Sequence, residues 1–210
     1  MFADRIDAAE QLASALTRYR GKNALVLGIP RGGVPMACLI AERLGGQVDV
    51  VLVRKLRAPG HAEFAIGSVD ESGWSYVNPD AAAAGADDSY IASEKARQLE
   101  TISARRKLYT AHRAPIDPTG RLVIVVDDGL ATGSTMIAAL HALRARHPEH
   151  LVCAIPVAPP ETIERVRSYC DEVVCLDAPP LFYAVGQFYR DFPQVSDDEV
   201  VTRLSPRNGG

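Results

Sequence analysis

Apolar and polar positions alternate along this chain in two distinct patterns. In residues 4–20, Ile6, Leu12 and Leu16 recur at helical spacing with charged residues between them, which predicts an amphipathic helix. Short apolar runs that predict buried strands cover residues 24–29, 48–53, 122–126, 151–157 and 172–176. Helical patterns lie between these runs at residues 33–44, 134–146 and 161–169. Repeated strand–helix units with wholly apolar strands predict a parallel sheet covered by helices on both faces.

The regular alternation breaks between residues 56 and 88. Two strand-like runs, residues 62–69 and 74–77, are bounded by proline and glycine turn signals and predict a hairpin. The alanine-rich residues 81–86 are expected to connect elements flexibly rather than to join the core. We therefore expect a flexible insertion at this point of the chain.

The remaining segments complete a single-domain organisation. A long polar helix is predicted at residues 89–111, and Ser196 opens a short last helix with a capping-box pattern. We expect one domain over residues 1–210, with a core over residues 21–178. The N-terminal helix and the C-terminal tail would lie over that core as a small hood.

Composition narrows the classes of function. The 210 residues are 47% hydrophobic, enough for a buried core, and a formal charge of −3 gives no general attraction to nucleic acid or an anionic membrane. Four cysteines without a CxxC pair are expected to be reduced and mostly buried thiols. The first residues lack a secretion signal, and no apolar run reaches the roughly 18 residues of a membrane span. These features predict a cytoplasmic globular protein.

Two predicted strands are followed by residues suited to an anion, and ligands of open parallel sheets bind at that edge. Pro30-Arg31-Gly32-Gly33 combines two glycines, an arginine and the start of a helix. A tight turn with a solvated arginine would have the same sequence. Arg54-Lys55 follow the second predicted strand at once and suit a diphosphate, or are two surface charges. The absence of a GxGxxG pattern around Gly28 argues against a dinucleotide-binding dehydrogenase.

The segment of residues 122–135 carries the strongest signal. Its apolar run is followed by the adjacent carboxylates of Asp127 and Asp128, which suit hydrogen bonds from vicinal ribose hydroxyls. Each such bond to a charged group contributes on the order of 1.5–3 kcal/mol. Next comes a loop whose N–H groups and hydroxyls suit a dianionic phosphate, formed by Ala131, Thr132, Gly133, Ser134 and Thr135. The order of these groups predicts a ligand that carries both a ribose and a phosphate.

Residues 123–135, Val-Ile-Val-Val-Asp-Asp-Gly-Leu-Ala-Thr-Gly-Ser-Thr, resemble the phosphoribosyl pyrophosphate (PRPP) motif of type I phosphoribosyltransferases at nearly every position. Gly129 departs from the motif, where an aliphatic residue is usual, and is expected to loosen the turn. The resemblance covers residues 24–176. It implies an α/β type I phosphoribosyltransferase fold: a five-stranded parallel sheet flanked by helices, with a small hood and a flexible loop or hairpin insertion. The segment from Val53 to Gly67 looks like a bacterial subgroup distinct from the adenine, hypoxanthine and orotate enzymes.

By that resemblance the reaction is displacement of pyrophosphate from C1 of PRPP by a nitrogenous base or related acceptor, with Mg²⁺ carried by PRPP. The implied catalytic residues are Asp127, Asp128, Arg31 and Lys55. The residues implied for the pyrophosphate are Arg31, Gly32, Gly33, Arg54 and Lys55, and residues 131–135 would bind the 5′-phosphate. A non-proline cis peptide, which recurs in the family's pyrophosphate loop, is predicted at Pro30–Arg31.

Several further roles follow from the resemblance with alternatives left open. His61 and Glu63 in the flexible loop are candidates for proton handling at the acceptor, or are residues of a solvated loop tip. Phe182 and Tyr183 would stack on a base, or pack the core. A homodimer is the family's usual state, and no nucleic acid or membrane partner is expected. The alternative function is a PRPP-sensing regulator of the same fold without transferase activity; the intact set of cations for the diphosphate favours the enzyme.

Overall fold

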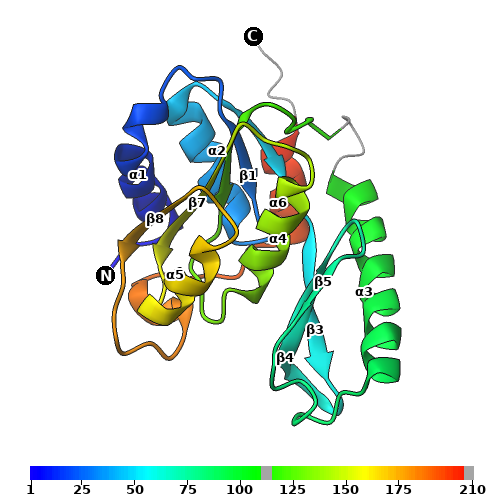
Figure 1. Cartoon of the computed structure of the whole chain (residues 1–210). Helices are drawn as coiled ribbons and strands as arrows, with labels where there is room; N and C mark the ends of the chain where they lie inside the picture. Colours follow the sequence, from blue (N-terminus) through cyan, green and yellow to red (C-terminus); the bar gives the residue numbers. More distant parts are fainter. Residues whose placement is uncertain (110–114, 206–210) are drawn as a thin grey trace.

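The computed structural model describes residues 1–109 and 115–205, apart from the side chains of residues 62 and 63. Its central strands are Leu25–Gly28 (β1), Gln47–Val50 (β2), Leu122–Val126 (β6), His150–Val157 (β7) and Glu172–Asp177 (β8). They form one five-stranded sheet in the order β2-β1-β6-β7-β8, and every neighbouring pair is parallel. The middle strand β6 is buried along its whole length. The predicted fold class is therefore confirmed (Figure 1).

Helices cover both faces of this sheet. The helices Arg5–Ala15 (α1) and Gly33–Leu44 (α2) pack on one face, and Ser134–Arg144 (α4) and Pro160–Arg167 (α5) on the other (Figure 1). Because successive side chains of a strand point to opposite faces, Ile124 belongs to the core under α1 and α2, whereas Val123 belongs to the core under α4. Each fully buried aliphatic side chain contributes about 1.5–3 kcal/mol through loss of contact with water.

The insertion forms a second, antiparallel sheet of Val53–Ala58 (β3), His61–Asp70 (β4) and Ser75–Val77 (β5). The predicted hairpin is confirmed as the β4–β5 pair. The single strand predicted at residues 48–53 is wrong: β2 ends at Val50, and β3 begins at Val53 in the other sheet. The expectation that residues 81–86 stay outside the core is also wrong, because Ala81 and Ala86 are each 4% exposed.

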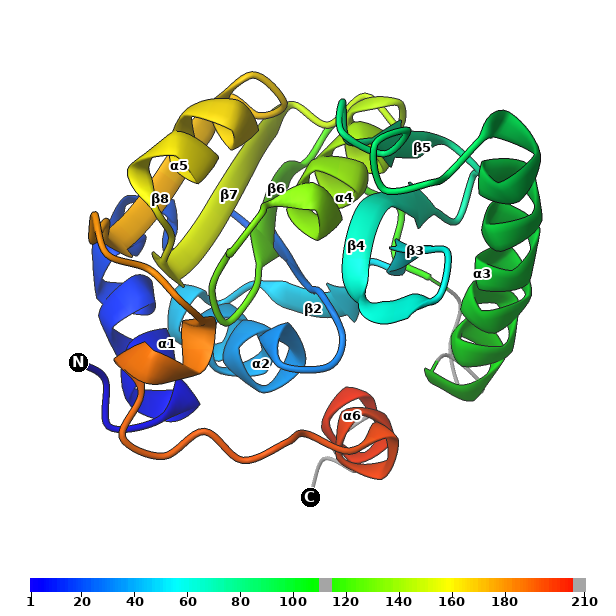
Figure 2. The same cartoon turned by 90° about the horizontal axis from the view of Figure 1, so that it is seen from below.

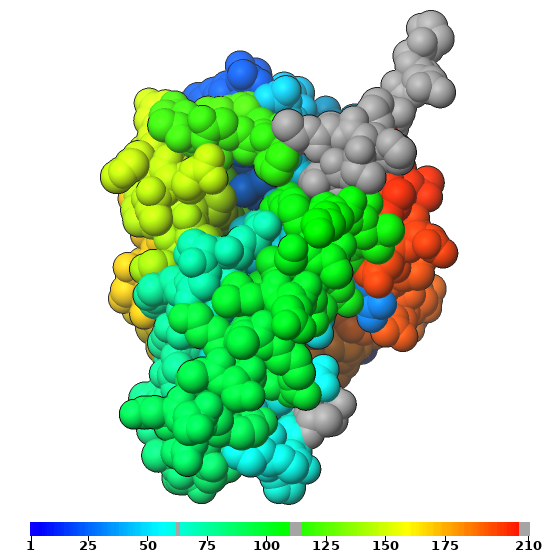
Figure 3. Space-filling view, turned by 90° about the vertical axis from the view of Figure 1, so that its right-hand side faces the viewer, coloured from blue at the N-terminus to red at the C-terminus, as the bar shows by residue number. Residues whose placement is uncertain are grey.

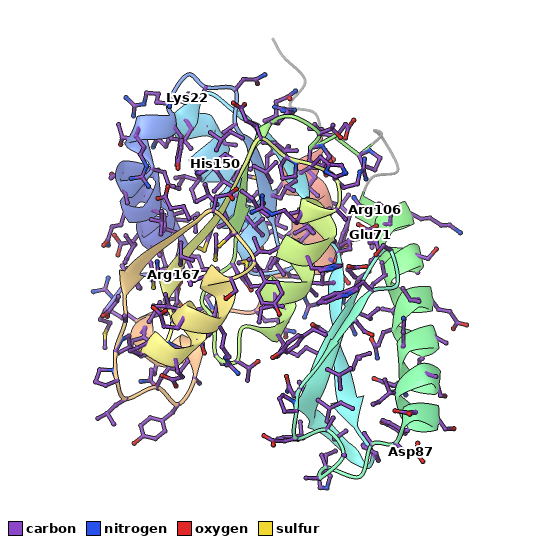
Figure 4. All side chains as sticks on the ribbon, in the orientation of Figure 1. Lys22, Glu71, Asp87, Arg106, His150 and Arg167 are labelled. Atoms are coloured by element: carbon purple, nitrogen blue, oxygen red, sulfur yellow. The ribbon has the colours of Figure 1, made fainter. Side chains whose placement is uncertain are left out.

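The long helix Asp88–Tyr109 (α3) covers the second sheet (Figure 3). The last two residues of the helix predicted at 89–111 lie outside the described residues. Arg106 of α3 pairs with Glu71 at the β4–β5 turn, with Nε 2.8 Å from Oε1 (Figure 4). A third apolar core lies between the two layers, and the last helix, Asp197–Leu204 (α6), contributes Val200 to it. Ser196 Oγ accepts a hydrogen bond from Glu199 N at 3.1 Å, which confirms the predicted N-terminal cap of α6.

The N-terminal residues pair with the segment around residues 188–190 beside the sheet. Phe2 N donates to Phe188 O at 2.8 Å, and Arg190 N donates to Phe2 O at 2.9 Å, which joins the N-terminus to the segment after the short 3-10 helix Val185–Phe188 (η2). All four cysteines are free thiols; Cys153 is buried and the others are half-buried. None of the helices in the described parts of the chain has the length and apolar character needed to cross a membrane.

Candidate active site

The loops that follow β1 and β6 lie side by side at the carboxyl edge of the sheet. Their strands are paired in register, with Gly28 opposite Val126, and Ile29 N donates to Val126 O at 2.9 Å. Seen from below, the end of β6 and the start of α4 lie next to α2 (Figure 2). The sequence motifs of residues 30–33 and 127–135 are thereby brought to one place.

The loop after β1 touches the aspartate pair directly. The Pro30–Arg31 peptide is cis, as predicted. Gly32 is the N-cap of α2 and makes no side-chain capping bond, so the first turn of α2 presents its N–H groups to this edge. A Cβ atom at Gly32 would lie 2.6 Å from Asp128 Cγ, and one at Gly33 would lie 3.1 Å from Asp127 Cα. Both glycines are needed for this close approach.

Asp127 and Asp128 stand half-buried at the end of β6, and Asp128 N donates to Asp127 Oδ1 at 2.9 Å. Burial raises the pKa of Asp127 well above its usual range; the Asp128 charge raises it further, whereas Lys55 and Arg5 oppose the shift. Burial also raises the pKa of Asp128, and the Arg5 guanidinium opposes that shift. Hydrogen-bond donors or cations supplied by a ligand would stabilise the ionised forms of these two neighbouring carboxylates.

An arginine that the sequence reasoning missed pairs with the second aspartate. Arg5 Nε and Nη2 each lie 2.9 Å from Asp128 Oδ2, and the two side chains are only 11% and 16% exposed. The guanidinium carbon lies 3.7 Å from the centre of the Phe192 ring. No spacing in the sequence links two residues 123 positions apart, so this contact depends on how α1 packs beside the sheet.

The C-terminal tail packs tightly around the turn after Asp128. The hydroxyl of Tyr189, which the sequence reasoning also missed, donates to Asp128 O at 2.6 Å. Burial raises the pKa of Tyr189, and the charge of Asp128 adds to the shift. Gly129 has φ of +149° and is buried, and a Cβ atom there would lie 2.7 Å from Val185 Cγ1. The tail fills the space that a side chain would take, so the turn requires glycine at this position, and its loosening stays a prediction.

The predicted phosphate loop leads directly into α4. Gly133 is the N-cap with φ of +73°, and no side chain caps the first turn, which leaves N–H groups of Ser134 and Thr135 for an anion. Thr132 is exposed, Ser134 is buried, and their hydroxyl oxygens are 3.1 Å apart. The loop therefore has the backbone arrangement of an anion site.

Helix α5 holds the carbonyl groups of this loop. Thr162 Oγ1 donates to Ala131 O at 2.7 Å, and Arg165 Nη2 donates to Thr132 O at 2.8 Å. These bonds occupy carbonyl oxygens that would repel a phosphate, and Arg165 adds a positive charge beside the loop. The sequence reasoning missed both residues, although their position in the first two turns of the helix after β7 was a usable signal.

The predicted basic pair reaches the site from the second sheet. Arg54 and Lys55 lie within β3, so the prediction that they follow the core strand directly is wrong. Lys55 is exposed, and its charge opposes the raised pKa of Asp127. Arg54 is half-buried and donates through Nε to Gln98 Oε1 at 3.1 Å.

Further arginines surround Arg54. Burial lowers the pKa of its guanidinium, and the positive charges of Arg105, Arg57 and Arg31 lower it further. Such a gathering of guanidinium groups suits a polyanion with several phosphate oxygens. Arg57 of β3 and Arg105 of α3 were not singled out from the sequence, because many similar charges lie in the same strand and helix.

Four of the predicted residues come from the insertion and the tail rather than from the loops after β1 and β6. His61 is exposed at the start of β4, beside a hollow of about 550 Å³ whose lining residues all come from the insertion. The side chain of Glu63 lies outside the described residues. Phe182 packs against the core and Phe188, with ring centres 5.0 Å apart, whereas Tyr183 is 86% exposed. Core packing, the alternative left open for the aromatic pair, fits Phe182.

Comparison with known proteins gives one family over almost the whole chain. The family described as "Phosphoribosyl transferase domain" matches residues 2–193. The Mycobacterium tuberculosis protein named "Putative phosphoribosyl transferase MT0597" is 43% identical over 205 residues, which cover 97% of this chain and 46% of that protein. The chain therefore spans about half the length of this curated relative.

Two further similarities differ in extent. The crystal structure of TT1426 from Thermus thermophilus is 45% identical, covers 97% of both chains and superposes with a TM-score of 0.81. A protein named uracil phosphoribosyltransferase from Renibacterium salmoninarum is 42% identical over 72 residues, which cover 34% of this chain and 33% of that protein. The first similarity extends over the whole fold, and the second covers about one third of the chain.

Proposed function

This chain belongs to the phosphoribosyl transferase family, and on that premise we propose that it displaces pyrophosphate from C1 of PRPP with a nitrogenous base or a related acceptor. The observation that carries the proposal is the contact of Gly32 with Asp128, beside the uncapped start of α4. One edge of the sheet thus holds groups suited to a diphosphate, a ribose and a monophosphate in the order in which PRPP carries them.

In the proposed reaction the chain holds PRPP in position and stabilises the charge that develops on it. Asp127 and Asp128 accept hydrogen bonds from the ribose hydroxyls, and the start of α4 binds the 5′-phosphate. Arg31 and Lys55 stabilise the charge that develops on the departing pyrophosphate. The ribose passes through an oxocarbenium-like state that the acceptor nitrogen attacks, so positioning replaces a nucleophilic side chain.

Magnesium is part of this proposal. In the described residues no three His, Cys, Asp or Glu side chains come together as a metal site. We propose that the ion arrives with PRPP and is held by its diphosphate. When bound, it would neutralise part of the diphosphate charge.

The acceptor is proposed only as a class. Nucleobases are the first candidates, and uracil leads because a relative named uracil phosphoribosyltransferase is 42% identical over 72 residues. Tyr183, exposed in the tail, is proposed to stack on the base. A homodimer and a cytoplasmic location complete the proposal, the latter supported by four free thiols.

The test is pyrophosphate release from PRPP and Mg²⁺ on addition of a panel of nucleobases that begins with uracil. We expect release with one acceptor and loss of release in Asp127→Asn. Lys22→Ala, at the opposite edge of the sheet, is the control and should keep the wild-type rate (Figure 4). PRPP binding without release for any acceptor would favour the PRPP-sensing regulator over the enzyme.

A further inference from the structure

The side chain of Arg5 is fixed on three sides. Its Nε donates to Asp128 Oδ2 at 2.9 Å, its Nη2 lies 2.9 Å from the same oxygen, and its Nη1 donates to Pro193 O at 2.6 Å. The plane of the guanidinium lies over Phe192, with Cζ 3.7 Å from the ring centre. The preceding Asp4 caps α1 by accepting from Ile6 N at 2.8 Å, which sets the start of the helix and the direction of Arg5.

Asp128 is held from the other sides as well. Gly32 approaches its carboxylate so closely that no Cβ atom fits between them. Tyr189 donates to the backbone oxygen of Asp128 at 2.6 Å. Arg5 pairs with Oδ2, and within residues 1–109 and 115–205 no other side chain donates a hydrogen bond to this carboxylate. One oxygen of the carboxylate is therefore held by Arg5, and no side chain pairs with the other.

We infer that Arg5 is a positioning residue of the ribose site, which holds the Asp128 carboxylate through Oδ2 and directs Oδ1 to a ribose hydroxyl. This inference rests on the proposed function. Arg5 touches neither C1 nor the leaving group in this arrangement; it acts through Asp128. It also connects α1, the tail and the end of β6, so one guanidinium links α1 and the tail to the proposed ribose site.

The electrostatic consequence is that Arg5 favours the ionised form of Asp128, against the effect of burial on its pKa. The titratable groups that face the aspartate pair are Arg5 from α1, Lys55 from β3, Tyr189 from the tail and the Cys153 thiol from β7. Burial raises the pKa of Asp128, and Arg5 is the cation that opposes the rise. Without Arg5, protonation of Asp128 should set in at a higher pH, and a protonated carboxyl is a poorer acceptor for a ribose hydroxyl.

The test compares Arg5→Gln and Arg5→Lys with wild type in PRPP binding by calorimetry with Mg²⁺, across about pH 5.5 to 8.5. Arg5→Gln should weaken binding about tenfold or more at neutral pH and move the loss of affinity on acidification to higher pH. Arg5→Lys should restore much of the pH profile. The control is Arg43→Gln, which breaks an exposed ion pair with Glu10 and should bind as wild type does.

Equal affinity and equal pH profiles for wild type and Arg5→Gln would overturn the inference. If Arg5→Gln does not fold, Phe192→Leu removes the support under the guanidinium and keeps its charge. Weaker binding by this variant would support the inference, and unchanged binding would overturn it.

A second readout needs no PRPP. The carboxyl carbon of Asp128 can be titrated by NMR in the full chain and assigned with Asp128→Asn. A higher midpoint in Arg5→Gln supports the Arg5–Asp128 coupling, and an unchanged midpoint overturns it. If wild type binds no PRPP while the midpoint shifts, the proposed function has failed and the coupling stands.

Discussion

Gly32 shows at the scale of one residue why two loops far apart in sequence form one site. Its backbone has φ of −60° and ψ of −35°, a conformation open to any residue. The requirement for glycine is therefore one of space, because a Cβ atom would lie 2.6 Å from Asp128 Cγ. A larger residue at this position has to push the carboxylate, and Arg5 with it, out of place.

We predict that Gly32→Ala keeps the fold but lowers PRPP affinity about tenfold or more, as expected for a displaced charged hydrogen bond. The matched control lies at the other end of the same helix. Gly45 has φ of +68° and no atom near its Cβ position, so Gly45→Ala should cost about 1 kcal/mol of stability through backbone strain and leave affinity unchanged. Calorimetry and urea unfolding of both variants measure the two effects; equal affinity for Gly32→Ala and wild type would contradict the steric account.

The raised pKa of Asp127 predicts in which direction the stability of the protein changes with pH. Burial and the Asp128 charge raise its pKa, so the native state binds a proton more readily than the unfolded chain. The ionised carboxylate then lowers stability above the raised pKa, and this cost disappears as pH falls toward the usual aspartate value of about 3.9. Asp127→Asn keeps the acceptor for Asp128 N and should be more stable than wild type at about pH 8, by a margin that shrinks at about pH 5.

Urea unfolding of both proteins at the two pH values measures this difference. PRPP affinity of wild type should change in the opposite sense and fall on acidification, because protonation removes the acceptors of the ribose hydroxyls. A margin that does not depend on pH, or that grows at low pH, would show that Asp127 is not held at a raised pKa.

At the scale of elements, α4 has two tasks. Its N-terminus is the candidate phosphate site, and its side is where the insertion docks. Ser68 of β4 donates through Oγ to Ser134 O at 2.6 Å, and both residues are buried. Trp74, before β5, stacks on His141 with ring centres 3.6 Å apart and an interplanar angle of 11°. The insertion that carries Lys55 is thereby fixed to the helix that would bind the phosphate.

We predict that His141→Ala loosens this docking without unfolding the core. The lost stack should cost about 0.5–1.5 kcal/mol beyond the lost burial. Trp74 is the single tryptophan of the chain, so its fluorescence emission reports this contact directly and should shift to longer wavelength in the variant. His61→Ala, at an exposed position, should leave the emission unchanged. Unchanged emission in His141→Ala would mean that the stack is not present in solution.

At the scale of the whole molecule, the parallel sheet could be predicted from the sequence, and the roles of residues 127–135 stay a prediction. Buried parallel strands are continuous apolar runs, so β6 was found with its bounds, and local rules gave the Ser196 cap. Residues 127–135 form a local motif whose order alone indicates a ribose beside a phosphate. Such features depend on neighbours in sequence, which is why they were accessible.

The contacts that complete the site depend on distant segments and could not be predicted. Arg5 and Tyr189 reach Asp128 because the N-terminal residues pair with the segment around residues 188–190, and neither position carries a local signal. The break between β2 and β3 was missed because the apolar run continues through Val51 and Leu52, which pack in two different cores. In the sequence the two residues belong to one apolar run, and only tertiary packing places them in different cores.

Asp128→Asn leaves the half-buried Arg5 without its ionised partner. We predict a loss of about 1–3 kcal/mol in the free energy of unfolding, measured by urea unfolding. Equal stability of variant and wild type would show that the pair contributes nothing to the fold.

The most direct test of PRPP binding at the end of β6 is titration of PRPP into the full chain with Mg²⁺ by calorimetry, for wild type and for folded Asp128→Asn. We expect wild type to bind one PRPP per chain. Binding by the variant should be weaker by about 1.5–3 kcal/mol, because a charged hydrogen bond to the ribose is lost. No binding by wild type, or equal affinity in the two proteins, would contradict the assignment of this edge of the sheet as a PRPP site.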